Sequence, residues 1–287
     1  MFYMNRKKIL VLPFILLNSV VIIAALFKGL QISLGYYPLI GLNKITVANF
    51  YQVLTDPFFQ KSLVYSCYLA LTATFLSLLL GTAVAFLLLK VKSSWLHKII
   101  SLPISLPHII VGLMMLQLIG QSGIISRILF QLGLIQEIGQ FPLFVHDSKG
   151  VGIILVFLYK EIPYVAVSIL AILQQIQLGY IEVARNLGAS NTRIFFTIVL
   201  PMIQKTLATL FIILFCFTFA SFEVPYLLGS PSNQTVALTA YDLFTQADLT
   251  TRPLAFALNL IISGICLAVT LLILTISNLL PGGRKTT

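Results

Sequence analysis

The stretch IEVARNLGASNTRIFFTIVLP, at residues 181–201, guides the interpretation of the whole chain. Apolar residues at helical spacing predict a short helix over 181–187, and Gly188 ends it because glycine readily takes the left-handed conformation found after helix C-termini. Ser190 is suited to cap a second helix. That helix has an apolar face until Pro201, which breaks or bends the chain. We therefore predict a compact helix-turn-helix, a shape suited to docking into a groove on another protein.

The sequence on both sides of this stretch is apolar enough to span a membrane. Of the 287 residues, 59% are hydrophobic and 9% are charged, and the mean hydropathy is +1.01. This composition excludes an ordinary soluble enzyme and a disordered chain. A bilayer core needs about 20 apolar residues of helix. Six stretches meet this requirement, at residues 9–27, 63–89, 99–119, 151–173, 207–228 and 254–280. We predict an all-α polytopic membrane protein with one domain over 1–287.

Basic residues alternate between the two sides of this predicted domain. One side has Glu182 as its only acid and holds eleven basic residues: Arg6, Lys7, Lys8, Lys90, Lys92, Lys98, Arg185, Arg193, Lys205, Arg284 and Lys285. The other side holds six, together with five carboxylates. Because Lys and Arg mark the cytoplasmic side, both termini and the loop 174–205 are predicted to be cytoplasmic. The net charge of +10 then reports topology and not a nucleic-acid surface, since no loop has a dense basic run with interleaved aromatics.

Smaller features complete the prediction of the fold. Pro103 and Pro107, followed by His108, should bend the third span. Apolar residues at helical spacing over 124–132 predict a short interfacial helix. The basic N-terminus with its long apolar run fits an uncleaved first helix better than a signal peptide. The three cysteines lie in apolar spans and the three histidines are far apart, so we expect neither a disulfide nor a metal site.

The segment at 181–201 resembles the cytoplasmic EAA signature of the permease subunits of type I, MetI-like, binding-protein-dependent ABC importers. The family pattern is Glu-Ala-Ala, three residues, Gly, nine residues, and then Ile-x-Leu-Pro. The matching positions are Glu182, Ala184, Gly188, Ile198, Leu200 and Pro201. Val183 departs from the pattern, because the family usually has Ala there.

This resemblance implies a MetI-like fold and a coupling helix that sits in a cleft of an ATP-binding subunit. The implied docking residues are Glu182, Ala184, Arg185, Gly188, Ala189, Arg193, Leu200 and Pro201. Arg185 and Arg193 could equally serve only as positive anchors on the inside. The sequence has no phosphate-binding loop, nucleophile elbow or HExxH motif, so ATP and Mg²⁺ would bind to partner subunits and the chain would hold no cofactor of its own.

The resemblance also implies the partners and the location of the chain. The partners would be two ATPase subunits, a second permease subunit that is a related chain or a second copy, and an extracytoplasmic substrate-binding protein. The chain would lie in the bacterial cytoplasmic (inner) membrane. A secondary transporter or channel is the alternative of another class, because it would also have six spans and buried carboxylates.

Two carboxylates are candidates for a substrate path or gate, because charges at membrane depth usually face a cavity or a partner. Glu161 and Glu223 each precede a proline by two residues, and proline frees a backbone carbonyl that can line a polar cavity. The alternative for Glu161 is a structural pair with Lys160 or with a neighbouring helix. Three further candidates are Tyr159, Tyr226 and Asp242.

The substrate class rests on a looser resemblance. Residues 222–229 and 248–255 are similar to the spermidine and putrescine branch of the family, and permeases for ferric iron, thiamine and phosphonate are close alternatives. Carboxylates in the path suit a cation, so the sequence favours a polyamine or another small cation.

Overall fold

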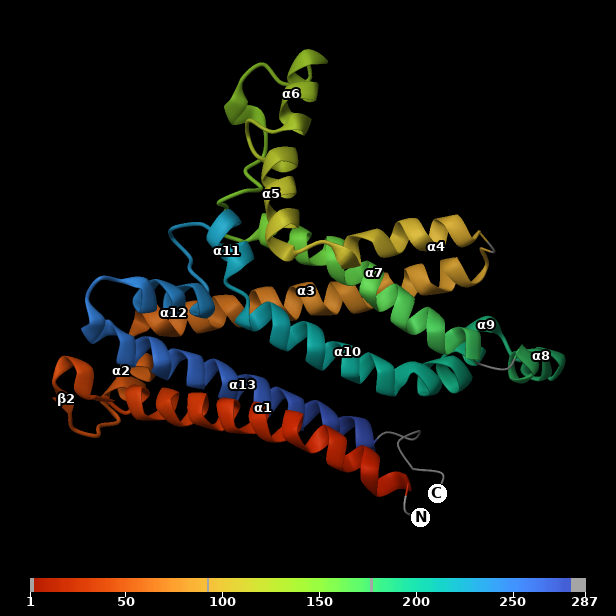
Figure 1. Cartoon of the computed structure of the whole chain (residues 1–287). Helices are drawn as coiled ribbons and strands as arrows, with labels where there is room; N and C mark the ends of the chain where they lie inside the picture. Colours follow the sequence, from red (N-terminus) through yellow and green to blue (C-terminus); the bar gives the residue numbers. More distant parts are fainter. Residues whose placement is uncertain (1–2, 92, 176–177, 280–287) are drawn as a thin grey trace. The chain divides into compact units, whose positions relative to one another are not determined.

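The computed structural model describes residues 3–91, 93–175 and 178–279 (Figure 1). Lys92, Arg284, Lys285, residues 176–177 of the predicted loop and position 280 of the predicted last span lie outside the described residues. The described chain is mainly helical. Its α-helices are α1 (Tyr3–Ser33), α2 (Ala48–Thr55), α3 (Pro57–Leu89), α4 (Ser94–Ser101), α5 (His108–Ile119), α6 (Ile124–Gln131), α7 (Val151–Gln175), α8 (Leu178–Asn186), α9 (Asn191–Ile194), α10 (Leu200–Ala220), α11 (Glu223–Leu228), α12 (Val236–Thr245) and α13 (Arg252–Leu279).

Short elements connect these helices. Strands β1 (Tyr36–Tyr37) and β2 (Leu42–Asn43) pair antiparallel. Four 3₁₀ turns are η1 (Pro38–Ile40), η2 (Leu102–Ser105), η3 (Ile138–Gln140) and η5 (Leu249–Thr251), and η4 (Phe195–Val199) is a π turn.

The chain forms two compact units. Unit 1 consists of Met1–Gln60 with Thr239–Ser263, and unit 2 of Lys61–Leu238 with Gly264–Thr287. The single domain over 1–287 stays a prediction. In unit 1, the Arg252 guanidinium donates a hydrogen bond to the Tyr37 hydroxyl at 3.3 Å and lies 4.9 Å from the centre of the Phe244 ring. Residues 178–199 and Glu161 with its hydrogen-bond partners belong to unit 2.

Six helical segments of the described chain are long and apolar enough to cross a membrane, which is the predicted number. They are Val11–Ser33, Pro57–Leu89, His108–Gln131, Val151–Gln175, Asn191–Ala220 and Leu249–Leu279. Most bounds agree with the predicted spans within a few residues. A helix also forms over the predicted interfacial segment, as α6, within the candidate span His108–Gln131; its place at the membrane interface stays a prediction. The side of the membrane on which the termini lie stays a prediction.

The predicted third span, 99–119, is wrong in its first half. Residues 94–101 form the separate helix α4, and α5 begins only at His108. Two prolines cause the interruption. Pro103 lies in the 3₁₀ turn and Pro107 has an extended ψ of 143° at the N-cap of α5, so their missing N–H groups fall outside helix interiors.

The predicted fifth span, 207–228, is also divided differently. The helix starts earlier, at Asn191, and α10 ends at Ala220 because Ser221 is extended, with ψ 131°. Pro225 explains the new start of α11 at Glu223, since proline is tolerated in the first turn of a helix but not in its interior. Pro201 does not break the chain. The π turn just before it passes into α10, and the Leu200 N–H bonds to Phe195 O within that turn.

Helix α7 is the central element of unit 2. Its fully buried residues include Ile153, Val156, Val165 and Ile169, and Phe157 is 1% exposed. It packs against α5, α10 and α11. Among the six apolar segments of the described chain it is the most buried, as expected of a helix that is apolar all round and packed between others.

Candidate functional site

The predicted helix-turn-helix forms as a tight hairpin of residues 178–199, which we call the Gly188 hairpin. Gly188 has φ +80°, its N–H bonds to Arg185 O, and the Ala189 N–H bonds to Ala184 O at 2.9 Å. This pair of bonds is the Schellman motif that ends helices at a left-handed residue. The Ser190 side chain then accepts a bond from the Arg193 N–H and caps α9. The left-handed glycine and the serine cap are both confirmed.

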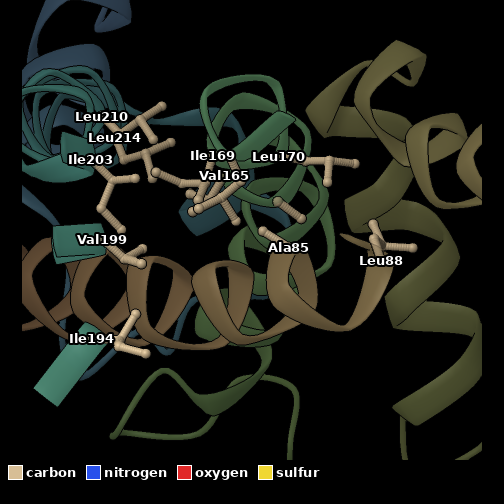
Figure 2. Close-up of a cluster of buried hydrophobic side chains, with 12 residues drawn as sticks. Ala85, Leu88, Val165, Ile169, Leu170, Ile194, Val199, Ile203, Leu210 and Leu214 are labelled. Atoms are coloured by element: carbon tan, nitrogen blue, oxygen red, sulfur yellow. The ribbon is translucent and has the colours of Figure 1, made fainter. Parts of the chain in front are cut away.

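One face of the Gly188 hairpin packs on the membrane helices of unit 2. Ile194 and Val199 belong to a cluster of twelve buried side chains, the hairpin cluster, whose other members come from α3, α7 and α10 (Figure 2). Those members are Ala85, Leu88, Val165, Ala166, Ile169, Leu170, Leu173, Ile203, Leu210 and Leu214. Phe195 adds an edge contact with Phe86, with ring centres 5.7 Å apart. The hairpin is therefore packed directly against three of the long apolar helices.

The opposite face of the Gly188 hairpin is exposed. Val183, within α8, is 58% exposed, and Leu187, directly after the last residue of α8, is 83% exposed. The predicted docking residues Glu182, Arg185 and Arg193 are exposed as well. Ala184, Ala189 and Leu200 are half-buried against the hairpin cluster, and Pro201 is half-buried. The large exposed apolar side chains among the described residues of the hairpin are thus Val183, Leu187 and Phe196, and the two alanines pack inward.

A buried carboxylate joins three helices of unit 2. Glu161, on α7, is 3% exposed. Its Oε2 accepts a hydrogen bond from Ser77 Oγ of α3 and its Oε1 one from Thr218 Oγ1 of α10, both at 2.9 Å. Burying a carboxylate is costly unless its oxygens are hydrogen-bonded, and here each oxygen has a hydroxyl donor. Glu161 is thereby joined to two neighbouring helices, which is one of the two structural pairings considered from the sequence.

A cavity of about 140 Å³ lies beside this carboxylate, and we call it the Lys160 cavity. Lys160 is 8% exposed and its Nζ donates a hydrogen bond to Leu106 O, in the proline-interrupted segment between η2 and α5. The centre of the His108 ring lies 4.5 Å from the centre of the Phe217 ring, and the two rings are tilted by 38°. The residues that line the cavity are Ile104, His108, Lys160, Glu161, Tyr164, Ile213, Leu214 and Phe217.

The other candidates are dispersed. Glu223 is exposed at the first position of α11, Tyr226 is 62% exposed on the same helix, and Tyr159 is half-buried against a second apolar cluster around Phe157. Asp242 belongs to unit 1, and burial raises the pKa of its carboxyl. The structure therefore does not gather the five path candidates into one site; Glu161 alone lines the Lys160 cavity.

Some functional candidates were missed from the sequence. Ser77 and Thr218 are 84 and 57 residues from Glu161 in the chain, and no local pattern connects them to it. Lys160 was considered only as a partner for Glu161. The pairing of Val183 with Leu187 could have been found from the sequence, because residues four apart lie on the same side of a helix, here away from Glu182, Arg185 and Asn186.

Comparison with known proteins identifies the family. The model of the binding-protein-dependent transport system inner membrane component matches residues 67–280, well over half of the sequence. The chain belongs to this family. Two solved structures share the fold: a bacterial alginate ABC transporter in complex with an alginate pentasaccharide-bound periplasmic protein, and the MetNI methionine ABC transporter. The first has a TM-score of 0.74 at 19% identity, covering 94% of this chain and 95% of the other, and the second a TM-score of 0.51 at 14% identity, covering 77% and 99%.

Among proteins similar in sequence is the chloroplastic sulfate permease 2 of Chlamydomonas reinhardtii, which is 26% identical over 227 residues. The match covers 77% of this chain and 58% of the algal protein. The molybdenum transport system permease protein ModB of Azotobacter vinelandii is 27% identical over 180 residues, covering 61% and 76%. The chain thus spans little more than half the length of the first of these relatives.

Proposed function

We propose that this chain is the permease subunit of an ATP-driven ABC importer, and that the Gly188 hairpin is the EAA-type coupling element that docks an ATPase subunit. The observation that carries the proposal is the two-faced hairpin. Ile194 and Val199 are buried among three membrane helices, whereas Leu187 is 83% exposed on the other face. An exposed apolar side chain surrounded by charges is typical of a protein interface. Family membership favours this function over a secondary transporter or a channel.

The proposed mechanism follows from this packing. The chain holds no nucleotide itself; two ATPase subunits carry ATP and Mg²⁺, and their closure pulls on the docked hairpins. The hairpin cluster passes the displacement to α3, α7 and α10 as packed bodies (Figure 2). A second permease subunit, related or identical, completes the path, and an extracytoplasmic binding protein delivers the solute in the bacterial cytoplasmic membrane. ATP or the solute can shift the transporter from one conformation to another only by binding one of the two conformations more tightly.

Copurification of the ATPase subunit with the membrane assembly tests the docking. In Gly188→Trp, a bulky side chain projects from the proposed interface, because a Cβ there meets no atom within 4 Å of this chain. We expect the ATPase to be lost while the membrane helices remain folded. Gly133→Trp is the matched control, because Gly133 has φ +71° and equally open surroundings but lies after α6. Retention of the ATPase by Gly188→Trp, or its loss from both variants, contradicts the proposal.

For the transported solute, we infer a small oxyanion. Glu161 has a hydroxyl donor on each oxygen, so the group at the Lys160 cavity that remains to act on a solute is the Lys160 ammonium with His108 beside it. A volume of about 140 Å³ suits a small ion better than an extended molecule. The names of the relatives, a sulfate permease and a molybdenum permease, support the same class. Phosphonate, one of the alternatives from the sequence, has the same chemistry.

The second candidate is the polyamine or other small cation favoured by the sequence. The exposed carboxylate of Glu223 at the head of α11 supports it, because a carboxylate in a solvent-open position attracts cations. Ferric iron and thiamine belong to the same cationic class.

One assay separates the two classes. The purified assembly is mixed with its binding protein loaded with sulfate, molybdate, phosphonate or spermidine, and ATP hydrolysis is measured. We expect stimulation by an oxyanion-loaded binding protein. Stimulation by the spermidine-loaded protein alone overturns the oxyanion and establishes the polyamine.

A further inference from the structure

The connection between the first two apolar spans is fastened to the end of α1 in unit 1. Ser33 is the last residue of the span Val11–Ser33. Its carbonyl accepts a hydrogen bond from the side-chain amide of Asn49 at 2.9 Å, and the Leu34 carbonyl accepts one from the Thr46 N–H at 2.7 Å. Because an apolar span ends where the hydrocarbon gives way to the headgroups, these bonds hold the start of α2 at that depth (Figure 1).

The starts of two other long helices lie beside the same connection. Helix α3 begins at Pro57, two residues after the last residue of α2. The first residue of α13, Arg252, donates a hydrogen bond to the Tyr37 hydroxyl at 3.3 Å. The connection also contains Tyr36 and Tyr51, and tyrosine is enriched where membranes meet water. These helix ends and tyrosines together indicate the level of a membrane surface.

Helix α2 has three different faces. Val53 is fully buried on its inner face. Gln52 and Thr55 are exposed and form a polar face. The third face is apolar and exposed, and its members are Val47, Tyr51 and Leu54. A spacing of four and three residues places these three side chains on one side of the helix. A polar and an apolar face, both open, are typical of a helix that lies in the plane of a membrane surface.

The exposed apolar surface extends beyond α2. Leu39, in η1, is 86% exposed, and Ile45, after β2, is 75% exposed. Lys44 is the only charged residue between positions 36 and 55. In water this stretch would expose a large apolar patch, which soluble surfaces rarely do. The patch continues the apolar surface of α1, where residues 11–28 are exposed or half-buried, so one layer of lipid can cover both.

We propose that residues 36–55 form an anchor, the α2 anchor, that inserts into the boundary between the lipid headgroups and the acyl chains. The inserted residues are Leu39, Ile45, Val47, Tyr51 and Leu54. Lipid is favoured over a second protein chain because the apolar surface is continuous with α1 and lies level with the ends of three long helices. Amphipathic helices reach about 5–10 Å into this boundary. Such an anchor fixes the depth and tilt of the first span.

This inference goes beyond the proposed function. It depends neither on the solute nor on the side of the membrane that the Gly188 hairpin faces. Its residues belong to unit 1, whereas the hairpin and the Glu161 link belong to unit 2.

Nitroxide labels on single cysteines test the α2 anchor. The variants Ile45→Cys, Tyr51→Cys and Leu54→Cys are labelled in the complete transporter, which is then placed in phosphatidylcholine vesicles. Relaxation of each label is measured with oxygen, which concentrates in hydrocarbon, and with a water-soluble nickel complex. Gln52→Cys and Thr55→Cys are the matched controls, because they lie on the polar face of the same helix. All five side chains are exposed, so their replacement does not threaten folding.

We expect the ratio of oxygen to nickel collisions to be severalfold higher at the three apolar positions than at the two polar ones. The chain without an added cysteine measures the contribution of the natural thiols. A higher rate of nickel collisions at all five positions would place α2 in water and overturn the proposal. Low collision rates with both reagents at Tyr51→Cys and Leu54→Cys would show that protein covers this face, and would overturn it as well.

Discussion

Glu161 shows how a single buried charge is accommodated in the membrane domain. Its two oxygens accept bonds from Ser77 and Thr218, so the carboxylate links α3, α7 and α10 at one point. Lys160, the next residue, points its ammonium to the Leu106 carbonyl that the prolines release from helical bonding. The two adjacent ionisable residues thus have different partners. Glu161 accepts bonds from hydroxyls of two other helices, and Lys160 donates to a backbone carbonyl at the proline break.

Replacement of Glu161 separates a structural from an electrostatic role. Glu161→Ala leaves two buried hydroxyls without their acceptor and removes side-chain volume, so we expect a loss of about 1–3 kcal/mol in stability, read as a lower Tm of the purified assembly. Glu161→Gln keeps the shape and one acceptor and should lose less. Glu223→Ala, at an exposed carboxylate, should change the Tm little. An unchanged Tm in Glu161→Ala would show that the three-helix link is unimportant.

The sequence predicted Glu161 as a special residue but not the site around it. An ionisable group in an apolar span is visible from composition alone. Its donors lie on helices that are distant in the chain, and their positions depend on how helix faces meet, which a single sequence does not specify. Ser77 and Thr218 look like ordinary small polar residues of apolar spans, where many hydroxyls bond only to their own helix, as Thr270 does to Cys266 O.

Among the elements, the Gly188 hairpin was predicted well and the third span poorly. The hairpin depends on local chemistry, because a left-handed glycine and a serine cap act within a few residues. The shape of the third span depends on how the chain accommodates its two prolines. Sequence patterns indicate that Pro103 and Pro107 disturb the helix, but whether the chain kinks or begins a new helix depends on partners such as Lys160, which takes up a freed carbonyl.

The contact between α3 and α7 gives a prediction at the level of the element. A Cβ on Gly81 would lie 2.5 Å from Val165 Cβ and 2.9 Å from Ile162 O, so the two helices touch without room for a methyl group. Gly81→Ala should force them apart and lower stability by about 1–3 kcal/mol, seen as a lower Tm. Because Ser77 is one helical turn from Gly81, the bond to Glu161 should lengthen as well.

Gly264→Ala is the matched control for this variant. Gly264 lies within α13, and a Cβ there meets no atom within 4 Å. Alanine is the better helix former by about 1 kcal/mol, so this variant should be neutral or stabilising. If both alanine variants lower the Tm equally, the close approach of α3 and α7 is not the cause.

At the level of the whole molecule, the number of spans follows from composition, whereas their orientation follows from charge. Six apolar helices appear both in the predicted pattern and in the described structure. The two compact units could not be predicted, because their boundaries fall inside the continuous helices α3, α12 and α13. The excess of basic residues on alternate loops predicts that the Gly188 hairpin lies on the cytoplasmic side.

Cysteine labelling in cells tests this orientation. Leu187→Cys, at the tip of the Gly188 hairpin, should react with a membrane-impermeant maleimide only in inside-out vesicles, because the loop is predicted to face the cytoplasm. Leu132→Cys, exposed at the end of α6, should react only from outside intact cells or spheroplasts. The three natural cysteines lie half-buried within spans and should label weakly from either side, which the unsubstituted chain measures directly. The reverse pattern would place the hairpin outside the cell, where no ATPase could reach it, and would overturn the proposed coupling together with the charge-based orientation.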